Sequence, residues 1–216
     1  AVNVDAVPVD TTKKDTLLPE GHLVPGMHLV KLMVQQGDSL VERRFKYFMP
    51  VTLSPDKPIS LIFEFHGSYG FDGPDEIADP LANISEANFL CQKAIKENIV
   101  ICYPAGSVEI SNEADTSGAV NWAGDGYTKS LPFVDAMVKY FTQDNEPRVD
   151  PNRIYSTGQS SGAIFSFTLA LHRSDVFAAI TPRAGQSASV EPFPSRAVPV
   201  RVFAGEIDDA VQHSAV

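Results

Sequence analysis

The residues best suited to perform chemistry are Gly158, Ser160 and Gly162, within the sequence Gly-Gln-Ser-Ser-Gly. Residues 153–157 before them have the pattern of a short β-strand, and residues 163–171 form an apolar run long enough for a helix. A sharp strand-to-helix turn exposes its central hydroxyl above the sheet, and the flanking glycines let it pass close to neighbouring backbone. The pattern therefore predicts Ser160 to be a nucleophile, the alternative being an ordinary glycine turn.

A serine hydroxyl becomes nucleophilic when a base takes its proton and an acid orients that base. In a strand-turn-helix arrangement the chain order is Ser, then Asp or Glu, then His. Asp208 lies just after a predicted strand over residues 198–204 and is the candidate acid. A purely turn-forming aspartate is the alternative.

Attack on a carbonyl also creates an oxyanion, which backbone N–H groups must stabilise. The N–H of Ser161 is one candidate donor, since it directly follows the nucleophile. The second is expected in the loop after a predicted strand over residues 59–65, where Ser68 is preferred and Tyr69 is the next choice. His66 is predicted to shape this loop rather than to carry protons.

Three side chains are candidate substrate contacts: Trp122, Tyr69 and Gln159. Trp122 belongs to a polar stretch over residues 105–127, predicted to be a loop that overhangs the site. Its indole either stacks on a sugar or phenolic ring or packs in the core. The acidic residues around Asp75 lack the alternating ligands of a calcium loop. We therefore expect no metal and no cofactor.

These candidates need a scaffold, and from residue 59 onward predicted strands and helices alternate, which is typical of parallel β-α-β units. A hairpin before them adds an antiparallel edge. The prediction is therefore an α/β fold with a mostly parallel, doubly wound sheet in one domain over residues 27–216, preceded by an irregular arm over residues 1–26. The expected strands are 27–34, 41–48, 59–65, 98–103, 153–157, 178–181 and 198–204, and the expected helices are 84–97, 132–141 and 163–171.

Composition limits the partners and the redox chemistry. The 216 residues are 44% hydrophobic and 20% charged, with a net charge of −10, which argues against nucleic-acid binding. No apolar run reaches the length of a membrane span, so no membrane partner is expected. Cys91 and Cys102 either form one disulfide or remain two buried thiols, and neither is assigned to catalysis.

Several segments together resemble a known family: the secreted polyhydroxybutyrate-depolymerase and feruloyl-esterase group of carbohydrate esterase family one. The resemblance spans about residues 40–210, and its most diagnostic part is Asp-Pro-Asn-Arg-Ile-Tyr at residues 150–155, leading into the serine turn. The other segments are Phe65-His66-Gly67, residues 100–104, Asn121-Trp122, residues 158–162, residues 177–180, and Val198-Pro199-Val200 with Gly205 and Asp208.

This resemblance implies an α/β-hydrolase fold and a secreted or periplasmic serine esterase that acts through an acyl-enzyme. Its substrate would be an ester, either an acylated plant polysaccharide or a polyester. Ser160 would be the nucleophile and Asp208 the acid, with Ser161 and the residue after His66-Gly67 forming the oxyanion hole. A serine peptidase on the same fold and a non-catalytic carbohydrate-binding relative are the alternatives.

The chain departs from the family pattern in its histidine. The pattern requires one beyond the acid, after a further strand, but only eight residues follow Asp208. Ser161-Gly162-Ala163 also replaces the common Asn-Gly-Gly, and Tyr69-Gly70 stands where relatives often have a cysteine or a glycine pair. Among the five histidines, His213 is too close in sequence to Asp208 to face the nucleophile. We therefore expect either a C-terminally incomplete chain, whose missing segment holds the last strand, the last helix and the histidine, or a non-catalytic relative.

Overall fold

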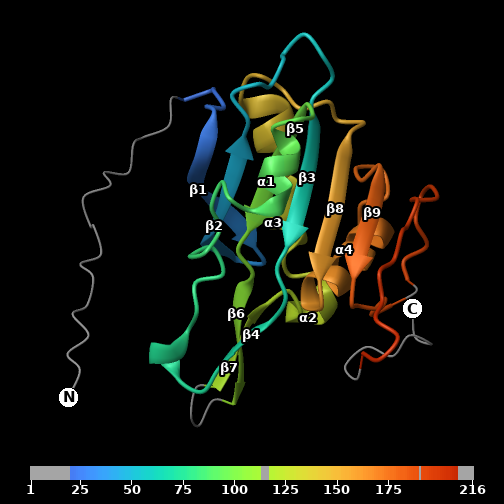
Figure 1. Cartoon of the computed structure of the whole chain (residues 1–216). Helices are drawn as coiled ribbons and strands as arrows, with labels where there is room; N and C mark the ends of the chain where they lie inside the picture. Colours follow the sequence, from blue (N-terminus) through green and yellow to red (C-terminus); the bar gives the residue numbers. More distant parts are fainter. Residues whose placement is uncertain (1–19, 113–116, 190, 209–216) are drawn as a thin grey trace.

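The computed structural model describes residues 20–112, 117–189 and 191–208. Six strands form its main sheet in the order β1-β2-β5-β3-β8-β9 (Figure 1). The pairings β1–β2 and β2–β5 are antiparallel, and the other three are parallel. This confirms the predicted mostly parallel sheet with an antiparallel N-terminal edge. The strand bounds are Gly26–Gln36 (β1), Ser39–Met49 (β2), Ser60–Phe65 (β3), Ile99–Pro104 (β5), Ile154–Gln159 (β8) and Ala179–Arg183 (β9).

The N-terminal hairpin is longer than predicted. Its register runs from Gly26 opposite Met49 to Gln36 opposite Ser39. Gly37 begins the two-residue turn with φ of 57°, a backbone conformation that costs glycine little and other residues more. Before the hairpin, His22 forms an isolated bridge with Glu146. The rest of the predicted arm, residues 1–19, lies outside the described residues.

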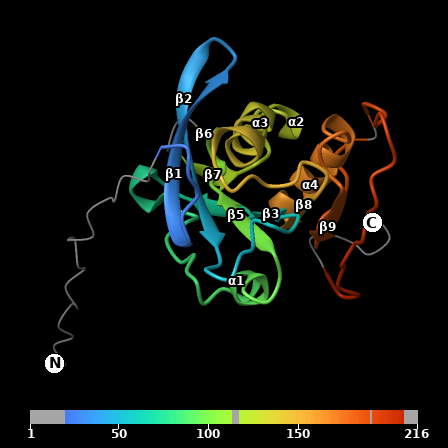
Figure 2. The ribbon, with the colours of Figure 1, turned by 90° about the horizontal axis from the view of Figure 1, so that it is seen from above.

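Helices cover both faces of the sheet. In Figure 2, α3 and α4 lie on one face and α1 on the other. Large apolar side chains fill the layer between the sheet and α3 and α4, and a smaller cluster lies under α1. The helix bounds are Phe89–Ala94 (α1), Gly124–Tyr127 (α2), Leu131–Lys139 (α3) and Ser161–His172 (α4), with a 3-10 turn at Pro74–Glu76 and a π-helical turn at Tyr140–Asp144.

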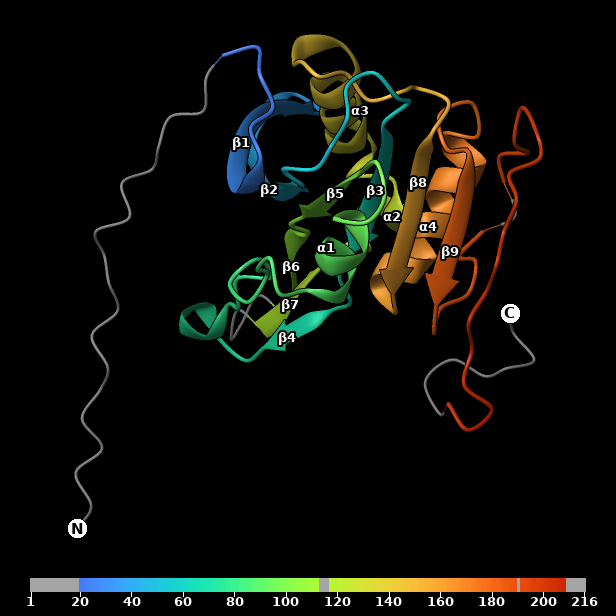
Figure 3. The ribbon, with the colours of Figure 1, turned by 45° about the horizontal axis from the view of Figure 1, so that its top comes forward.

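The prediction that residues 105–127 form a loop is wrong. Most of this stretch forms β6 (Ser107–Asn112) and β7 (Ser117–Asn121), which pair with β4 (Tyr69–Phe71) in a second, antiparallel sheet. Figure 3 shows this small sheet beyond the carboxyl ends of the parallel strands. Polar composition suggested a loop because these strands are short and half-exposed, so they lack an apolar run.

The helix predicted over residues 84–97 is also wrong in extent, because only Phe89–Ala94 is helical. The Lys46 ammonium donates to the carbonyls of Leu81 and Ile84, at 2.7 and 3.0 Å, and ties this segment to β2. The Asn88 side chain then accepts from the Leu90 N–H and starts the helix there. These tertiary contacts compete with helix formation in the first part of the segment. The helix is therefore shorter than its local sequence pattern predicts.

The strand predicted over residues 198–204 is reduced to two parallel bridges, Ile180 with Val200 and Arg183 with Phe203. Its backbone hydrogen bonds alternate along β9 as in a parallel ladder. They are interrupted at Pro182, because proline has no N–H to donate to the neighbouring chain. The segment therefore runs parallel to β9, as predicted, but does not form a continuous strand.

The two cysteines are free thiols and do not form a disulfide. They belong to the clusters on opposite faces of the sheet, Cys91 on the buried side of α1 and Cys102 on β5, where it faces α3. The Cys91 sulfur hydrogen-bonds the Tyr103 hydroxyl at 3.3 Å, and Cys102 lies 3.8 Å from the Met137 sulfur. Burial raises the pKa of both thiols, so they behave as small core residues. Within the described chain, no helix is long and apolar enough to cross a bilayer.

Candidate active site

Ser160 occupies a strained turn between β8 and α4. Its φ of 53° and ψ of −118° lie outside the ordinary regions for a residue with a side chain, at a cost of about 1–3 kcal/mol. The Ser160 N–H donates to the Arg183 carbonyl at 3.0 Å, and the Ser160 carbonyl accepts from Ala163 and Ile164 at the start of α4. Ser160 is exposed. Hydrogen bonds on both sides thus maintain a conformation that presents its hydroxyl at the carboxyl end of the sheet.

The two glycines of the motif are required by close packing, as predicted. A Cβ at Gly158 would lie 2.5 Å from the carbonyl carbon and oxygen of Gly162 and 2.8 Å from the Phe65 carbonyl oxygen. A Cβ at Gly162 would overlap the Phe65 carbonyl oxygen. Since all of these neighbours are backbone atoms, neither site has room for a larger residue.

The loop after β3 runs directly against the serine. A Cβ built at Gly67 would lie 3.5 Å from the Ser160 Cβ. Ser68 follows and is exposed, and no described residue accepts a hydrogen bond from its N–H. Ser161 is the first residue of α4, so its N–H has no acceptor within the helix. The two predicted oxyanion donors are thus available on the two segments that meet at Ser160.

His66 stabilises this loop through both ring nitrogens. Its Nε2 accepts from the Gly106 N–H at 2.8 Å, which places the ring proton on Nδ1, 2.5 Å from the Gly67 carbonyl oxygen. Burial lowers the pKa of His66, and the hydrogen bond to Gly67 partly opposes this effect. His66 is therefore a neutral residue that connects two loops, in agreement with its predicted structural role.

Trp122 was a candidate substrate contact, and the structure contradicts this role. Its side chain is only 1% exposed, and its indole stacks on Phe165 with ring centroids 5.1 Å apart. The Trp122 Nε1–H donates to the His66 carbonyl at 2.9 Å, and its backbone N–H donates to the Ser161 hydroxyl at 3.2 Å. Trp122 is therefore a packed core residue that supports the loops around Ser160. This is the packing role that the sequence left as the alternative.

Tyr69 and Gln159, the other two candidate substrate contacts, line one cavity of about 160 Å³. His66, Gly67 and the apolar Leu81 also line this cavity. The cavity therefore lies beside the residue that precedes Ser160. Its mixed lining suits a small substituent with both polar and apolar atoms.

Asp208 follows the segment that pairs with β9, and β9 pairs with β8. Parallel strands place their carboxyl ends at one edge, so Asp208 leaves the sheet on the side where Ser160 lies. Asp208 is half-buried, and its N–H donates to the Gly205 carbonyl at 3.4 Å. Its role as the catalytic acid stays a prediction.

No histidine in the described part of the chain hydrogen-bonds Ser160. His66 hydrogen-bonds Gly67 and Gly106, and His172 ends α4, the helix whose N-cap is Ser160. His22 pairs with Glu146, and the His28 ring lies 2.9 Å from the Pro25 carbonyl oxygen, both at the N-terminal edge. His213 lies outside the described residues. The general base is thus not among the histidines that the structure places.

Sequence reasoning missed an ion pair that crosses the sheet beneath the serine turn. The Arg183 guanidinium bridges the Glu64 carboxylate and also donates to the Thr157 hydroxyl at 3.1 Å. Burial raises the pKa of Glu64, and the bond to Arg183 opposes this shift. Because the Arg183 carbonyl accepts from the Ser160 N–H, one residue connects the ion pair to Ser160. The only sequence signal was the single acidic residue in the apolar run of β3.

The chain is similar to known proteins in structure, but the comparisons of its sequence find no match. No family model matches the chain, and no curated protein matches it. Among solved structures, it is similar to a thermostable esterase, with 22% identity and a TM-score of 0.56 over 87% of this chain and 49% of that one. A ferulic acid esterase matches at 15% identity and a TM-score of 0.51, over 74% of this chain and 59% of that one.

A putative dipeptidyl aminopeptidase IV from Bacteroides ovatus gives 16% identity and a TM-score of 0.50, covering 75% of this chain and 21% of that one. The chain thus spans about half the length of the esterases that it matches. Identities this low establish the fold alone. With the parallel sheet, the helices on both faces and the serine turn after β8, these matches show that the chain has the α/β-hydrolase fold.

Proposed function

We propose that the chain carries the nucleophile of a serine carboxylic-ester hydrolase. The observation that supports this most directly is the strained Ser160 turn, with φ of 53°, facing the Gly67 loop at the carboxyl end of the sheet. A strained residue supported by hydrogen bonds on both sides is typical of a functional site. Strain at this position has no structural benefit of its own, because glycine would adopt the same conformation at lower cost.

In the proposed reaction the Ser160 Oγ attacks the ester carbonyl carbon while a base takes its proton. The Ser161 and Ser68 N–H groups stabilise the oxyanion of the tetrahedral intermediate. The C–O bond to the alcohol then breaks, the base returns the proton to the leaving oxygen, and an acyl-enzyme remains. Water, deprotonated by the same base, attacks the acyl carbon and releases the acid and the free serine. Asp208 is the proposed acid that orients the base.

The proposed base is a histidine outside the described residues. A histidine in sequence beyond Val216 would serve, and a further C-terminal segment agrees with the chain covering about half the length of the thermostable esterase. The non-catalytic alternative rests on the same observation, since Ser160 has no histidine partner in the described chain. Labelling of Ser160 separates the two.

The proposed substrate is an ester of a feruloyl or acetyl group on a plant polysaccharide, or a hydroxybutyrate polyester. Support comes from the family resemblance and from the cavity bordered by Tyr69 and Gln159, which offers a ring and an amide to a small acyl group. The same resemblance is the basis for proposing a secreted or periplasmic location. No nucleic-acid or membrane partner is proposed.

The test combines covalent labelling with turnover, in this chain and in the whole gene product. A fluorophosphonate should add one adduct, located by peptide mapping on Ser160 and absent from Ser160→Ala. Methyl ferulate, p-nitrophenyl acetate and a hydroxybutyrate ester then rank the acyl groups, and a peptide amide tests the peptidase alternative. Hydrolysis should fall by about 10⁴-fold or more in Ser160→Ala. If the whole gene product binds sugar but neither labels at Ser160 nor hydrolyses an ester, it is a non-catalytic relative.

A further inference from the structure

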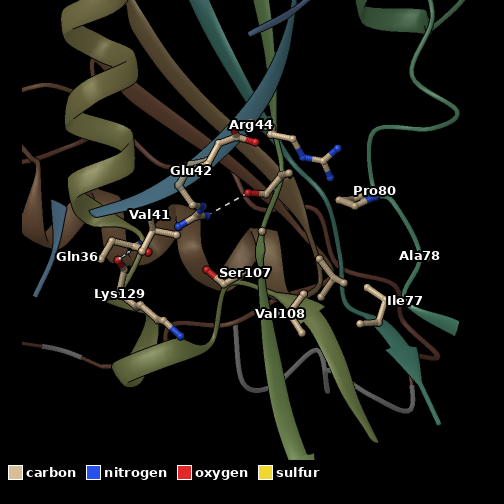
Figure 4. A pocket seen from close by; sticks show the side chains of 14 residues that line it. Gln36, Val41, Glu42, Arg44, Ile77, Ala78, Pro80, Ser107, Val108 and Lys129 are labelled. Atoms are coloured by element: carbon tan, nitrogen blue, oxygen red, sulfur yellow. Dashed lines mark hydrogen bonds between the residues drawn. The ribbon is translucent and has the colours of Figure 1, made fainter. Parts of the chain in front are cut away.

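A second and larger cavity, of about 380 Å³, lies between the β1–β2 hairpin, residues 77–80 and the start of β6 (Figure 4). Its apolar lining includes Val41, Ile77 and Val108. Pro80 lines this cavity and also the smaller one beside Gln159, so the two share a wall. No step of the proposed ester hydrolysis uses it.

A buried cation lines this cavity. Arg43, on β2, is only 5% exposed. Its guanidinium donates to the Ala105 carbonyl at 3.0 Å and to the Ser130 hydroxyl at 3.3 and 3.4 Å, and lies over the Phe133 ring at 4.4 Å. All of these partners are neutral. Burial lowers the pKa of Arg43 to about 10, with Glu109 opposing, so the side chain stays charged at neutral pH.

Within the described residues, no carboxylate lies at ion-pair distance from Arg43. The other two cations that line the cavity each have a carboxylate partner. Lys129 pairs with Glu109 at 2.9 Å, and Arg44 pairs with Asp79 at 3.4 Å. The three hydrogen bonds of Arg43 leave its Nε–H and one Nη1 hydrogen without an acceptor in the described chain. A buried charge of this kind is costly until an anion meets it.

The cavity also contains an unused hydroxyl. The Ser107 Oγ is buried and has no hydrogen-bond partner among the residues that the structure places. Figure 4 shows the Ser107 side chain in the wall of the cavity, with its oxygen toward Val41 and Lys129. A buried polar atom without a partner is unusual and costs about 1–3 kcal/mol, so this hydroxyl is available to hydrogen-bond a group that enters the cavity.

From this arrangement we infer that the cavity binds the carboxylate of a small molecule with an apolar body, with the Arg43 guanidinium and the Ser107 hydroxyl as donors. The free Nε–H of the guanidinium can donate one charge-assisted hydrogen bond to a carboxylate oxygen. A dianion such as phosphate fits less well, because Arg43 is the one cation of the cavity without a carboxylate partner in the described chain. The apolar side chains around Val41 would surround the body of the ligand.

The occupied cavity would contact the loops that position the nucleophile. The Ala105 carbonyl, which accepts from Arg43, is followed by Gly106, and both residues line the cavity. The Gly106 N–H donates to His66, whose ring in turn bonds the Gly67 carbonyl beside Ser160. The site is nevertheless separate from the ester chemistry, and its test does not depend on turnover.

The test is a calorimetric titration of Ser160→Ala protein with benzoate and with benzamide, its neutral isostere. We expect benzoate to bind and benzamide to bind at least tenfold more weakly, because only benzoate carries the charge. Ser107→Ala should weaken benzoate binding about fivefold, through loss of one hydrogen bond, and Arg43→Gln should weaken it tenfold or more. Lys57→Gln, a change of one exposed charge outside the cavity lining, is the control and should leave binding unchanged.

The inference is overturned if benzoate does not bind, if benzamide binds equally well, or if Ser107→Ala leaves the affinity for benzoate unchanged. Arg43→Gln is checked by circular dichroism before titration. Should that variant not fold, the benzoate–benzamide contrast and Ser107→Ala decide the outcome without it.

Discussion

Replacing Arg183 by methionine should destabilise the fold and weaken the Ser160 turn together. Arg183→Met keeps most of the side-chain length but removes the guanidinium from Glu64 and Thr157. Breaking a fully buried ion pair on one side costs about 3–5 kcal/mol. The Arg183 side chain is 39% exposed and that of Glu64 is 17% exposed, so solvent screening reduces the expected loss to about 1–3 kcal/mol at pH 7.

The loss of stability in Arg183→Met should increase as the pH rises. Burial already raises the pKa of Glu64 above 4.5, and removing Arg183 takes away the group that opposes this shift. A carboxyl with a raised pKa in the folded state contributes stability below its unfolded pKa and loses it as pH rises through the folded pKa. The difference between wild type and Arg183→Met should therefore be small near pH 4.5 and grow towards pH 7.

Urea unfolding at several pH values measures this difference, and Glu64→Gln with Arg183→Met completes a double-mutant cycle. In the Glu64→Gln background the pH dependence of the Arg183→Met loss should disappear. Lys139→Met, which removes the more exposed pair with Asp144, is the matched control and should cost less than 1 kcal/mol. A loss in Arg183→Met that is the same at pH 4.5 and pH 7 would refute this reasoning. Fluorophosphonate labelling of Ser160 should also slow, because the lost ion pair no longer anchors residue 183, whose carbonyl accepts from the Ser160 N–H.

Three further outcomes are expected. Gly162→Ala should lower stability by about 1–3 kcal/mol, measured by thermal unfolding, because its Cβ would overlap the Phe65 carbonyl. Stability should fall as pH drops below 6.5, because the lowered pKa of folded His66 lets the unfolded chain take up a proton first, and His66→Gln should reduce this slope in urea titrations. Trp122→Phe should cost about 1 kcal/mol for the lost bond to the His66 carbonyl and leave KM for any ester that the protein hydrolyses unchanged, since the indole is buried.

Each of these three predictions has a control or a result that would contradict it. Gly73→Ala is the control for Gly162→Ala, because nothing lies within 4 Å of a Cβ at Gly73 and its backbone is extended. An unchanged slope in His66→Gln would show that another group titrates in this range. A raised KM in Trp122→Phe would show that the indole reaches the substrate after all.

Most strands and the serine turn could be predicted from the sequence because their signals are local. Apolar runs such as residues 59–65 predict strands inside the sheet, and β3 is buried on one face and half-buried on the other. The spacing of Gly158 and Gly162 around Ser160 is a local signal, and the structure shows that both glycines are required by close contact with neighbouring backbone. The role of His66 was also predictable, since a histidine beside a glycine in this loop has backbone groups within reach.

Other features depended on residues far apart in the chain, which no local pattern contains. The sequence did not show whether Trp122 stacks on a substrate ring or packs in the core. Its burial against Phe165 shows that it packs in the core. The Glu64–Arg183 pair joins positions 119 residues apart across three strands, and the unpaired charge of Arg43 is visible only once β2 and β6 enclose a cavity. Composition and spacing therefore determined the fold class and the nucleophile candidate, whereas the polar groups that support or surround the site were decided by tertiary packing, because burial and charge pairing are properties of neighbours in space.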